Sequence, residues 1–274
     1  MNARYISINT ELVQEADAKI HVSDLSIQRG FGIFDFLKTI NGQPIFIENH
    51  FDRFYNSAKE LGLTIGYDRE SLLNAVKALM EKNNMPNSGI KFILTGGFSA
   101  DGYTIGEPNL VITQSPFEYD TTAFDKGTTL VTYNHQRQLA VIKTIDYLQA
   151  IRLQPYIKQN NADDVLYHDN GMIRECPRAN FFMVKDQRII SPKTAILKGI
   201  TRSKVLDMTV ADFSIVEEDF TLEDLAKADE AFITSSTKNV LPVLEIDGQK
   251  VGDGKPGKIT RQLNEQFTAL IQRG

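Results

Sequence analysis

One lysine lies in a setting that would make its amine reactive. Lys143 has apolar neighbours on both sides in Ile142-Lys143-Thr144-Ile145, where a solvated lysine would need none. Partial burial disfavours the charged form of a lysine, so its amine can attack a carbonyl and later carry a proton. For a lysine taken alone, an ordinary place at the end of a strand is the better interpretation. The case for chemistry therefore depends on residues further along the chain.

Two features downstream of Lys143 complete a chemical pattern. Gly199-Ile200-Thr201 precedes an apolar-periodic run from Val205 to Val210, which predicts a turn at the start of a helix. The free N–H groups and the dipole at such a start attract phosphate. Glu175 supplies a carboxylate of the kind that keeps a pyridine nitrogen protonated. A lysine imine, a phosphate cradle and this carboxylate together indicate pyridoxal 5'-phosphate, an electron sink for carbanion chemistry.

The elements that must position these residues form two predicted α+β lobes. Residues 1–118 would be a small domain, 119–123 a polar linker, and 124–274 a larger domain that carries Lys143. Period-two patterns predict strands in the small domain at Tyr5–Ile8, Lys19–Val22, Phe31–Ile40, Gly89–Thr95 and Leu110–Gln114. Helical periods begin at Glu48 and again near Leu72.

The larger domain should mix strands and short helices in the same way. Strands are expected at Thr128–Tyr133, Asp164–His168, Met172–Glu175, Asn180–Val184, Ser214–Val216, Glu230–Thr234 and Val243–Ile246. After Lys143 a helix is expected through Leu148 to Ile157. Tyr147 would then lie one turn after Lys143 on the same helix face.

Composition limits the classes of function. The chain has 274 residues, 42% hydrophobic and 24% charged, with a formal net charge of −5 and no basic stripe among aromatics, which argues against nucleic acid or anionic membranes as partners. The single cysteine, Cys176, excludes an internal disulfide framework and fits a reducing compartment. No signal peptide, bilayer-spanning run or metal site is indicated. We therefore expect a cytoplasmic protein.

Longer motifs give the chain a family resemblance. Ile196–Arg202 (ILKGITR), Phe232–Thr237 (FITSST) and Leu241–Gly248 (LPVLEIDG) are similar to stretches of D-amino acid aminotransferases. The chain resembles the fold-type IV pyridoxal-phosphate enzymes along nearly its full length; these include branched-chain aminotransferases, D-amino acid aminotransferases and aminodeoxychorismate lyases. The resemblance implies an α+β fold with a small α/β sandwich lobe and a larger β-barrel-like lobe.

The resemblance also implies roles for particular residues. Lys143 would form the imine with the cofactor and carry the proton. The residues implied in cofactor binding are Arg53 (phosphate), Tyr147 (ring hydroxyl), Glu175 (ring nitrogen), Leu197 (ring face), and Ile200, Thr201 and Ser236 (phosphate). A solvated side chain is the default for Arg53, but its motif favours the phosphate role; Tyr147 and Leu197 could equally be core residues. Cys176 and Pro177 depart from the small residues usual after this glutamate, but the role of Glu175 needs only its carboxylate.

The substrate is indicated mainly by an absence. D-amino acid aminotransferases of the familiar type have an arginine and a histidine in the loop that matches Gly96–Gly102, and this sequence has neither. Arg29 aligns where branched-chain enzymes place a tyrosine that enters the neighbouring subunit's site, and Arg178 lies three residues after Glu175. We hypothesise that these two arginines bind the substrate α-carboxylate, with Arg29 coming from the partner chain. Phe34 and Thr237 would be further substrate contacts.

The expected function is transamination by a ping-pong mechanism. The amino group would move between a D-amino acid, of the D-alanine or D-glutamate type, and a 2-oxo acid such as 2-oxoglutarate, in a homodimer with its sites at the subunit interface. A branched-chain L-aminotransferase is the main alternative, because Phe31 and Phe34 would line an apolar pocket. An aminodeoxychorismate lyase and a protein that only holds the cofactor also stay open.

Overall fold

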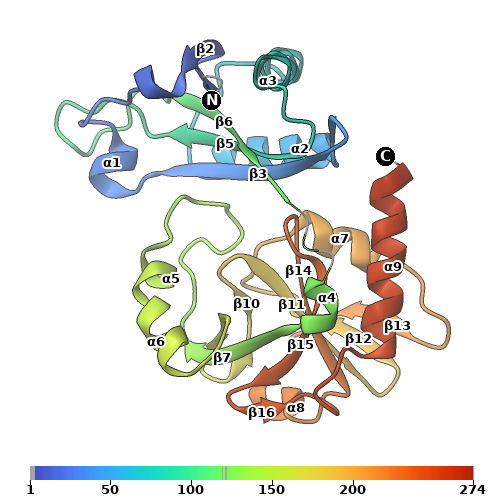
Figure 1. The fold of residues 1–274 in the computed structure, drawn as a ribbon. Helices are drawn as coiled ribbons and strands as arrows, with labels where there is room; N and C mark the ends of the chain where they lie inside the picture. The colour runs from blue at the N-terminus through green and yellow to red at the C-terminus, as the bar shows by residue number, and fades with distance from the viewer. Residues whose placement is uncertain (1–3, 119, 121, 274) are drawn as a thin grey trace. The chain divides into compact units, whose positions relative to one another are not determined.

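The structure, a computed structural model, describes residues 4–118, 120 and 122–273. The chain divides into two compact units: unit 1 runs to Glu118 and also takes in Ile142–Asp146, and unit 2 contains the remainder (Figure 1). The expected linker at 119–123 falls partly outside the described residues, which leave out 119 and 121. The short segment that carries Lys143 thus belongs with the N-terminal unit.

Unit 1 is a six-stranded antiparallel sheet in the order β2-β1-β6-β5-β3-β4. Its elements are β1 (Tyr5–Ile8), β2 (Glu11–Gln14), a 3-10 helix (Glu15–Asp17), α1 (Leu25–Arg29), β3 (Gly32–Ile40), β4 (Gln43–Pro44), α2 (Ile47–Glu60), α3 (Arg69–Asn83), β5 (Ser88–Thr95) and β6 (Leu110–Pro116). Alternate residues of β3 face one side. Ile33 and Leu37 therefore pack with Phe51 and Phe54 of α2 in one apolar core. Phe34 lies on the other side of the strand.

The predicted strand at Lys19–Val22 is wrong. These residues form no strand, and Val22 is 70% exposed. The strand is instead Glu11–Gln14, which pairs with β1 across a turn at Asn9 and Thr10, both with positive φ. Two such residues suit a tight hairpin turn. An alternation with only two apolar residues and no strand to pair with does not make a sheet strand.

Unit 2 is built on a curled ten-stranded sheet, whose main path is β13-β12-β11-β14-β15-β7-β8-β9. Its strands are β7 (Thr128–Asn134), β8 (Asp164–Asp169), β9 (Met172–Ile173), β10 (Glu175–Cys176), β11 (Ala179–Lys185), β12 (Arg188–Ser191), β13 (Ser214–Glu217), β14 (Glu230–Ser235), β15 (Asn239–Ile246) and β16 (Gln249–Lys250). Its helices are α4 (Ala123–Lys126), α5 (Leu148–Arg152), α6 (Gln154–Gln159), α7 (Ile200–Leu206), α8 (Leu222–Leu225) and α9 (Lys258–Arg273). The long helix α9 packs along β14 and β15 (Figure 1). Cys176 is a small residue in the apolar core.

The helix predicted to follow Lys143 begins later than expected. The backbone around Lys143 is extended and pairs with β3: the amide of Phe34 donates to the Lys143 carbonyl (2.9 Å), and Thr144 bridges Ile33. The first helical residue is Leu148, so the argument that placed Tyr147 and Lys143 on one helix face is wrong. Backbone pairing with β3 outweighed the local helical pattern. Among the described residues, no helix combines the length and apolar character needed to cross a bilayer.

Candidate active site

Lys143 lies against an aromatic ring in unit 1. Its Nζ is 4.4 Å from the centroid of the Phe34 ring, a distance suited to a cation–π contact. The side chain is half-buried, and its backbone amide donates to the Ser57 hydroxyl (3.4 Å). The pairing with β3 thus holds the lysine amine over a fixed ring, so the structure brings Lys143 and Phe34 together.

A buried ion pair fixes Arg53 close by in the same unit. Its Nε and Nη2 donate to the two carboxylate oxygens of Asp35, both at 2.8 Å, and His50 Nδ1 lies 2.7 Å from Oδ1. Burial would raise the pKa of Asp35, but the charges of Arg53 and His50 and their hydrogen bonds outweigh it and hold that pKa well below the ordinary value. Burial lowers the pKa of His50, and the charges of Arg53 and Lys143 act in the same direction against Asp35. One edge of the Arg53 guanidinium is therefore occupied, which the sequence did not reveal.

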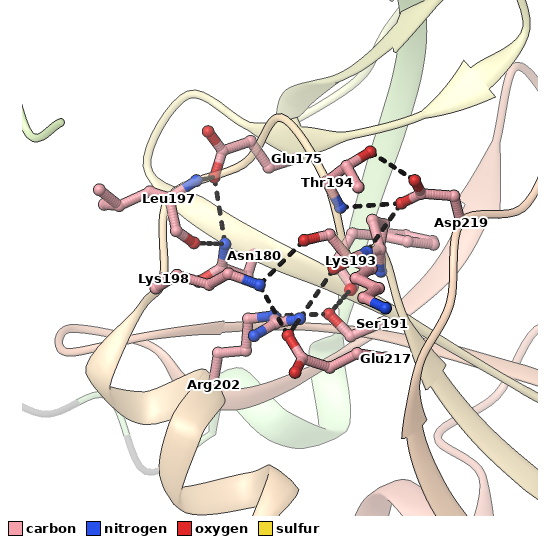
Figure 2. A network of polar contacts seen from close by, with 12 residues as sticks. Glu175, Asn180, Ser191, Lys193, Thr194, Leu197, Lys198, Arg202, Glu217 and Asp219 are labelled. Carbon is pink, nitrogen blue, oxygen red and sulfur yellow. Dashed lines mark hydrogen bonds and ion pairs between the residues drawn. The ribbon is translucent and has the colours of Figure 1, made fainter. Parts of the chain in front are cut away.

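Glu175 in unit 2 is a buried carboxylate, and its hydrogen-bond donors among the described residues include Arg137, Asn180 and the Leu197 amide. Arg137 Nη1 donates to Oε1 (2.8 Å), while the Asn180 side chain and the Leu197 amide both donate to Oε2 (3.1 Å). The Asn180 amide also donates to the Leu197 carbonyl (2.7 Å), so one side chain ties Glu175 to the loop before α7 (Figure 2). These contacts fix the orientation of the carboxylate. Sequence reasoning missed Arg137, because nothing in its local sequence distinguishes it from a surface arginine.

The turn at Gly199 is packed as tightly as a glycine allows. A Cβ at this position would lie 2.0 Å from Asn180 Oδ1, which no other residue type avoids without movement. Gly199 is the N-cap of α7, and no described side chain caps it, so no side chain competes for the first N–H groups. The Ile200 and Thr201 side chains are buried.

Arg202, fully buried, anchors α7 to the strands beneath it. Its Nε donates to Ser191 Oγ (2.8 Å), and its Nη2 donates to the Pro192 carbonyl (2.8 Å) and to Glu217 Oε1 (2.7 Å) (Figure 2). Lys198 also reaches Glu217 (2.7 Å). Glu175 and the start of α7 are therefore parts of one hydrogen-bonded framework.

The turn between β14 and β15 lies at the same end of the sheet as Glu175. Asn180 pairs with Thr234 and also with Glu175, while Ser235 pairs with Asn239 across the turn. This turn carries Ser236, half-buried, and Thr237, exposed. The structure thus brings Ser236 and Thr237 to the same end of the sheet as Glu175 and Asn180.

The remaining predicted residues are divided between the units. Arg178, in the turn between β10 and β11, is 68% exposed with its Nη2 3.8 Å from Asp164 Oδ2. Arg29 belongs to unit 1, where its Nε donates to the Gly102 carbonyl (3.1 Å). Tyr147 lies just before α5. The pKa of the buried Tyr167 phenol is raised by burial first and by the charge of Asp164 second, and Tyr147 contributes in the same direction.

The profile of one family, Amino-transferase class IV, matches residues 32–246. The chain is a class IV aminotransferase. It is 33% identical over 276 residues to the D-alanine aminotransferase of Staphylococcus haemolyticus, covering 97% of this chain and 98% of that protein. It is 31% identical over 279 residues to that of Listeria monocytogenes serotype 1/2a, covering 98% and 96%.

Solved structures bear out the fold of this aminotransferase. The branched-chain amino acid aminotransferase of Escherichia coli superposes with a TM-score of 0.91 at 24% identity, covering 98% of this chain and 95% of that one. The enzyme of Thermoproteus uzoniensis, solved with norvaline, gives a TM-score of 0.88 at 24% identity, also covering 98% and 95%. These neighbours confirm the two-lobed fold-type IV prediction.

Family membership confirms the predicted cofactor and enzyme class: the chain is a pyridoxal-phosphate-dependent aminotransferase. The described residues fit this cofactor, because the buried Glu175 carboxylate, which accepts hydrogen bonds from Arg137, Asn180 and the Leu197 amide, can face a protonated ring nitrogen. The free N–H groups at the uncapped turn at Gly199 can donate hydrogen bonds to phosphate oxygens. The individual roles of the site residues belong to the proposed function.

Proposed function

We propose that this aminotransferase moves an amino group between a D-amino acid, of the D-alanine or D-glutamate type, and a 2-oxo acid such as 2-oxoglutarate. The observation that carries the proposal is the similarity to D-alanine aminotransferases, at 31–33% identity across nearly the whole of both chains. The branched-chain structures cover as much of the chain at 24% identity. Sequence similarity therefore favours the D-amino acid reaction.

Lys143 and Glu175 carry the proposed chemistry. The cofactor, when bound, supplies an electron sink that stabilises negative charge at the substrate Cα. Lys143 Nζ, on a half-buried side chain beside the Phe34 ring, would accept the proton from the substrate Cα and donate it again as the amino group is transferred. Glu175, held by Arg137, Asn180 and the Leu197 amide, keeps the ring nitrogen protonated.

Four of the predicted residues would hold the phosphate. Ile200 and Thr201 offer N–H groups at the uncapped turn and Ser236 offers a hydroxyl. Arg53 would offer its Nη1 side, since Asp35 occupies the edge formed by Nε and Nη2. Its guanidinium is pre-oriented by this ion pair, which reduces the entropy lost on binding. We also assign Tyr147 to the ring hydroxyl and Leu197 to one face of the ring.

Arg29 and Arg178 would bind the substrate α-carboxylate. Arg29 donates to the carbonyl of Gly102, so its guanidinium lies at the Gly96–Gly102 loop, where familiar D-amino acid aminotransferases have their own arginine. Arg178 is 68% exposed and available to a ligand. A pair of guanidinium groups suits a carboxylate. Phe34 and Thr237 would complete the substrate pocket.

We further propose that the enzyme is a cytoplasmic homodimer in which Arg29 serves the partner's site. Large apolar side chains are exposed around α1 and the loop that Arg29 contacts: Val22, Ile27, Phe98, Tyr103 and Ile105. Exposed apolar groups gathered in this way are typical of an interface between proteins. Two hydrogen-bonded contacts, Leu25 to Gly97 and Ser99 to Ser23, join α1 to this loop in one surface.

The test is a transamination assay with the purified holoenzyme. D-alanine and 2-oxoglutarate should yield pyruvate and D-glutamate, and the cofactor's visible absorption should bleach with D-alanine but not with L-leucine. Conversion of L-leucine with no reaction of D-alanine would overturn the proposal in favour of the branched-chain alternative, which the fold neighbours and the Phe34 ring beside Lys143 support. Pyruvate released only from aminodeoxychorismate would identify a lyase instead.

A further inference from the structure

Three charged side chains meet behind the proposed carboxylate site of unit 2. Arg178 comes from the turn between β10 and β11, and Lys238 from the turn between β14 and β15. Both approach Asp164 Oδ2, the guanidinium at 3.8 Å and the ammonium at 3.6 Å. The exposed fractions of the side chains are 68% for Arg178, 28% for Lys238 and 5% for Asp164.

Asp164 is a buried carboxylate whose charge must be balanced. Its Oδ1 accepts a hydrogen bond from the Val165 amide (2.9 Å), but its Oδ2 accepts none from any described residue. A buried carboxylate is costly unless a cation lies beside it. Two cations share this one anion, which leaves one positive charge in excess.

Two other neighbours of Asp164, Cys176 and Tyr167, do not balance its negative charge. Burial, with the charge of Asp164 in second place, raises the pKa of the Cys176 thiol well above its ordinary value, so the thiol stays neutral. The same two causes raise the pKa of Tyr167, so its phenol stays neutral as well. The balance therefore falls to Lys238 and Arg178.

We propose that Lys238 neutralises Asp164 and thereby leaves the Arg178 guanidinium available to the substrate carboxylate. The inference rests on the proposed role of Arg178 in binding that carboxylate. Lys238 is the nearer and the more buried of the two cations, so it supplies the charge that Asp164 needs. Lys238 is then a positioning residue that acts through Asp164.

Loss of the ammonium would close the carboxylate site. With Lys238 neutral, Asp164 would retain one ion-pair partner among the described residues, the Arg178 guanidinium at 3.8 Å. A shift of less than about 1 Å would turn that contact into a direct, charge-assisted hydrogen bond. The guanidinium would then be occupied by an internal anion, and a substrate carboxylate would have to displace it.

The experiment measures binding of propionate, which is D-alanine without its amino group, to the holoenzyme by calorimetry. Arg178→Ala and Lys238→Met should each weaken binding by about tenfold, the usual effect of losing one charged hydrogen bond. The double variant Asp164→Asn, Lys238→Met should recover to within about threefold of the wild type, because the competing anion is gone. Lys255→Met, which removes an exposed lysine of the same unit, should bind propionate as the wild type does.

The outcomes separate this inference from the function on which it rests. Unchanged binding by Arg178→Ala would remove Arg178 from the carboxylate site. Weakened binding by Arg178→Ala with unchanged binding by Lys238→Met would overturn the role of Lys238 alone. A folded double variant that binds as weakly as Lys238→Met would show that Lys238 contacts the ligand itself, which also overturns it. If Lys238→Met does not fold, Asp164→Asn alone decides: wild-type or tighter binding supports the inference, and weaker binding overturns it.

Discussion

At the scale of single residues, the site depends on charges that are oriented before any ligand arrives. Asp35 is fully buried and shared between Arg53 and His50, and Glu175 is shared between Arg137, Asn180 and the Leu197 amide. A side chain held by two or more partners has lost its freedom already, so binding costs less entropy. Both carboxylates therefore act as fixed parts of the scaffold.

The effect of replacing Asp35 on the free energy of unfolding should depend on pH, because Asp35 contributes through its charge. Asp35→Asn should lower the free energy of unfolding by about 3 kcal/mol at neutral pH, because it breaks a buried ion pair. The folded-state pKa lies below the unfolded one, so the stability that the carboxylate contributes is complete above the unfolded pKa and is lost as the pH falls through the folded pKa. The difference between variant and wild type should therefore shrink below about pH 4.

Urea unfolding at a series of pH values measures this difference. Asp253→Asn is the matched control and should leave stability unchanged, because Asp253 is exposed and, within the described part of the chain, its side chain accepts only from the Lys255 amide. A difference that stays constant from neutral to acidic pH would show that Asp35 contributes through packing and not through its charge.

Residue types and spacing single out Lys143 and Glu175 as candidate site residues but do not predict their partners. An apolar setting and an ordered motif distinguish these two residues. Arg137 could not, since its contact with Glu175 joins residues far apart in the chain. The occupied edge of Arg53 could not be predicted for the same reason: in the sequence, Asp35 is one polar residue in an aromatic strand.

At the scale of elements, one loop of unit 2 joins the start of α7 to Glu175 and Asn180. The loop between β12 and α7 begins at Pro192, held by Arg202, and ends at Gly199, packed on Asn180. Asp219 also accepts from the amides of Lys193 and Thr194 (Figure 2). The loop therefore has little freedom, and it sets the position of Leu197 against Glu175.

A single methyl group at Gly199 should disturb this loop. Gly199→Ala would place its Cβ 2.0 Å from Asn180 Oδ1, so Asn180 must move and release Glu175 or the Leu197 carbonyl. The backbone φ at Gly199 is −67°, so the clash and not the dihedral is responsible. We expect the affinity for pyridoxal phosphate to fall at least about tenfold, as when a supporting contact of a binding group is lost.

The affinity can be followed by titrating the apoenzyme with cofactor and recording its visible absorption. Gly66→Ala is the control, because a Cβ there would meet no atom of the residues that the structure describes within 4 Å, and it should leave the affinity unchanged. Wild-type affinity in Gly199→Ala would mean that the loop tolerates a displaced Asn180.

Elements with many apolar residues were predictable, and short or paired ones were not. The helices α2 and α3 and the strands β3, β5 and β6 follow their periodic patterns closely. The strand β12 was missed, since Arg188–Ser191 is short and is recognised only by its pairing with β11 and β13. Around Lys143, hydrogen bonds to β3 override a pattern that by itself favours a helix.

At the scale of the whole molecule, the residues assigned to the proposed function come from distant parts of the chain and from a second copy of it. Lys143, Phe34 and Arg53 belong to unit 1, while Glu175 and Arg178 belong to unit 2. Arg29 would come from the partner. An interface that completes a site links activity to assembly, so the effect of Arg29 should depend on which chain carries the change.

Mixed dimers test this dependence. Lys143→Ala should be inactive and Arg29→Ala weakly active, each as a homodimer. If Arg29 acts across the interface, refolding the two together should restore about a quarter of the wild-type activity, since half of the random dimers carry one intact site. No gain over the separate variants would place Arg29 in its own chain's site, and monomers in sedimentation analysis would refute the dimer itself.

The route of the chain between the units limits how the molecule can be divided. The polypeptide leaves the first unit at Glu118, returns for Ile142–Asp146 and leaves again, and Ile142 fills part of that unit's apolar core. An expressed fragment that stops at Glu118 would lack both the Ile142 core side chain and Lys143. Neither unit can therefore be transferred to another protein as an active module. Recombination within the family must keep the segment Ile142–Asp146 together with unit 1, or activity is lost.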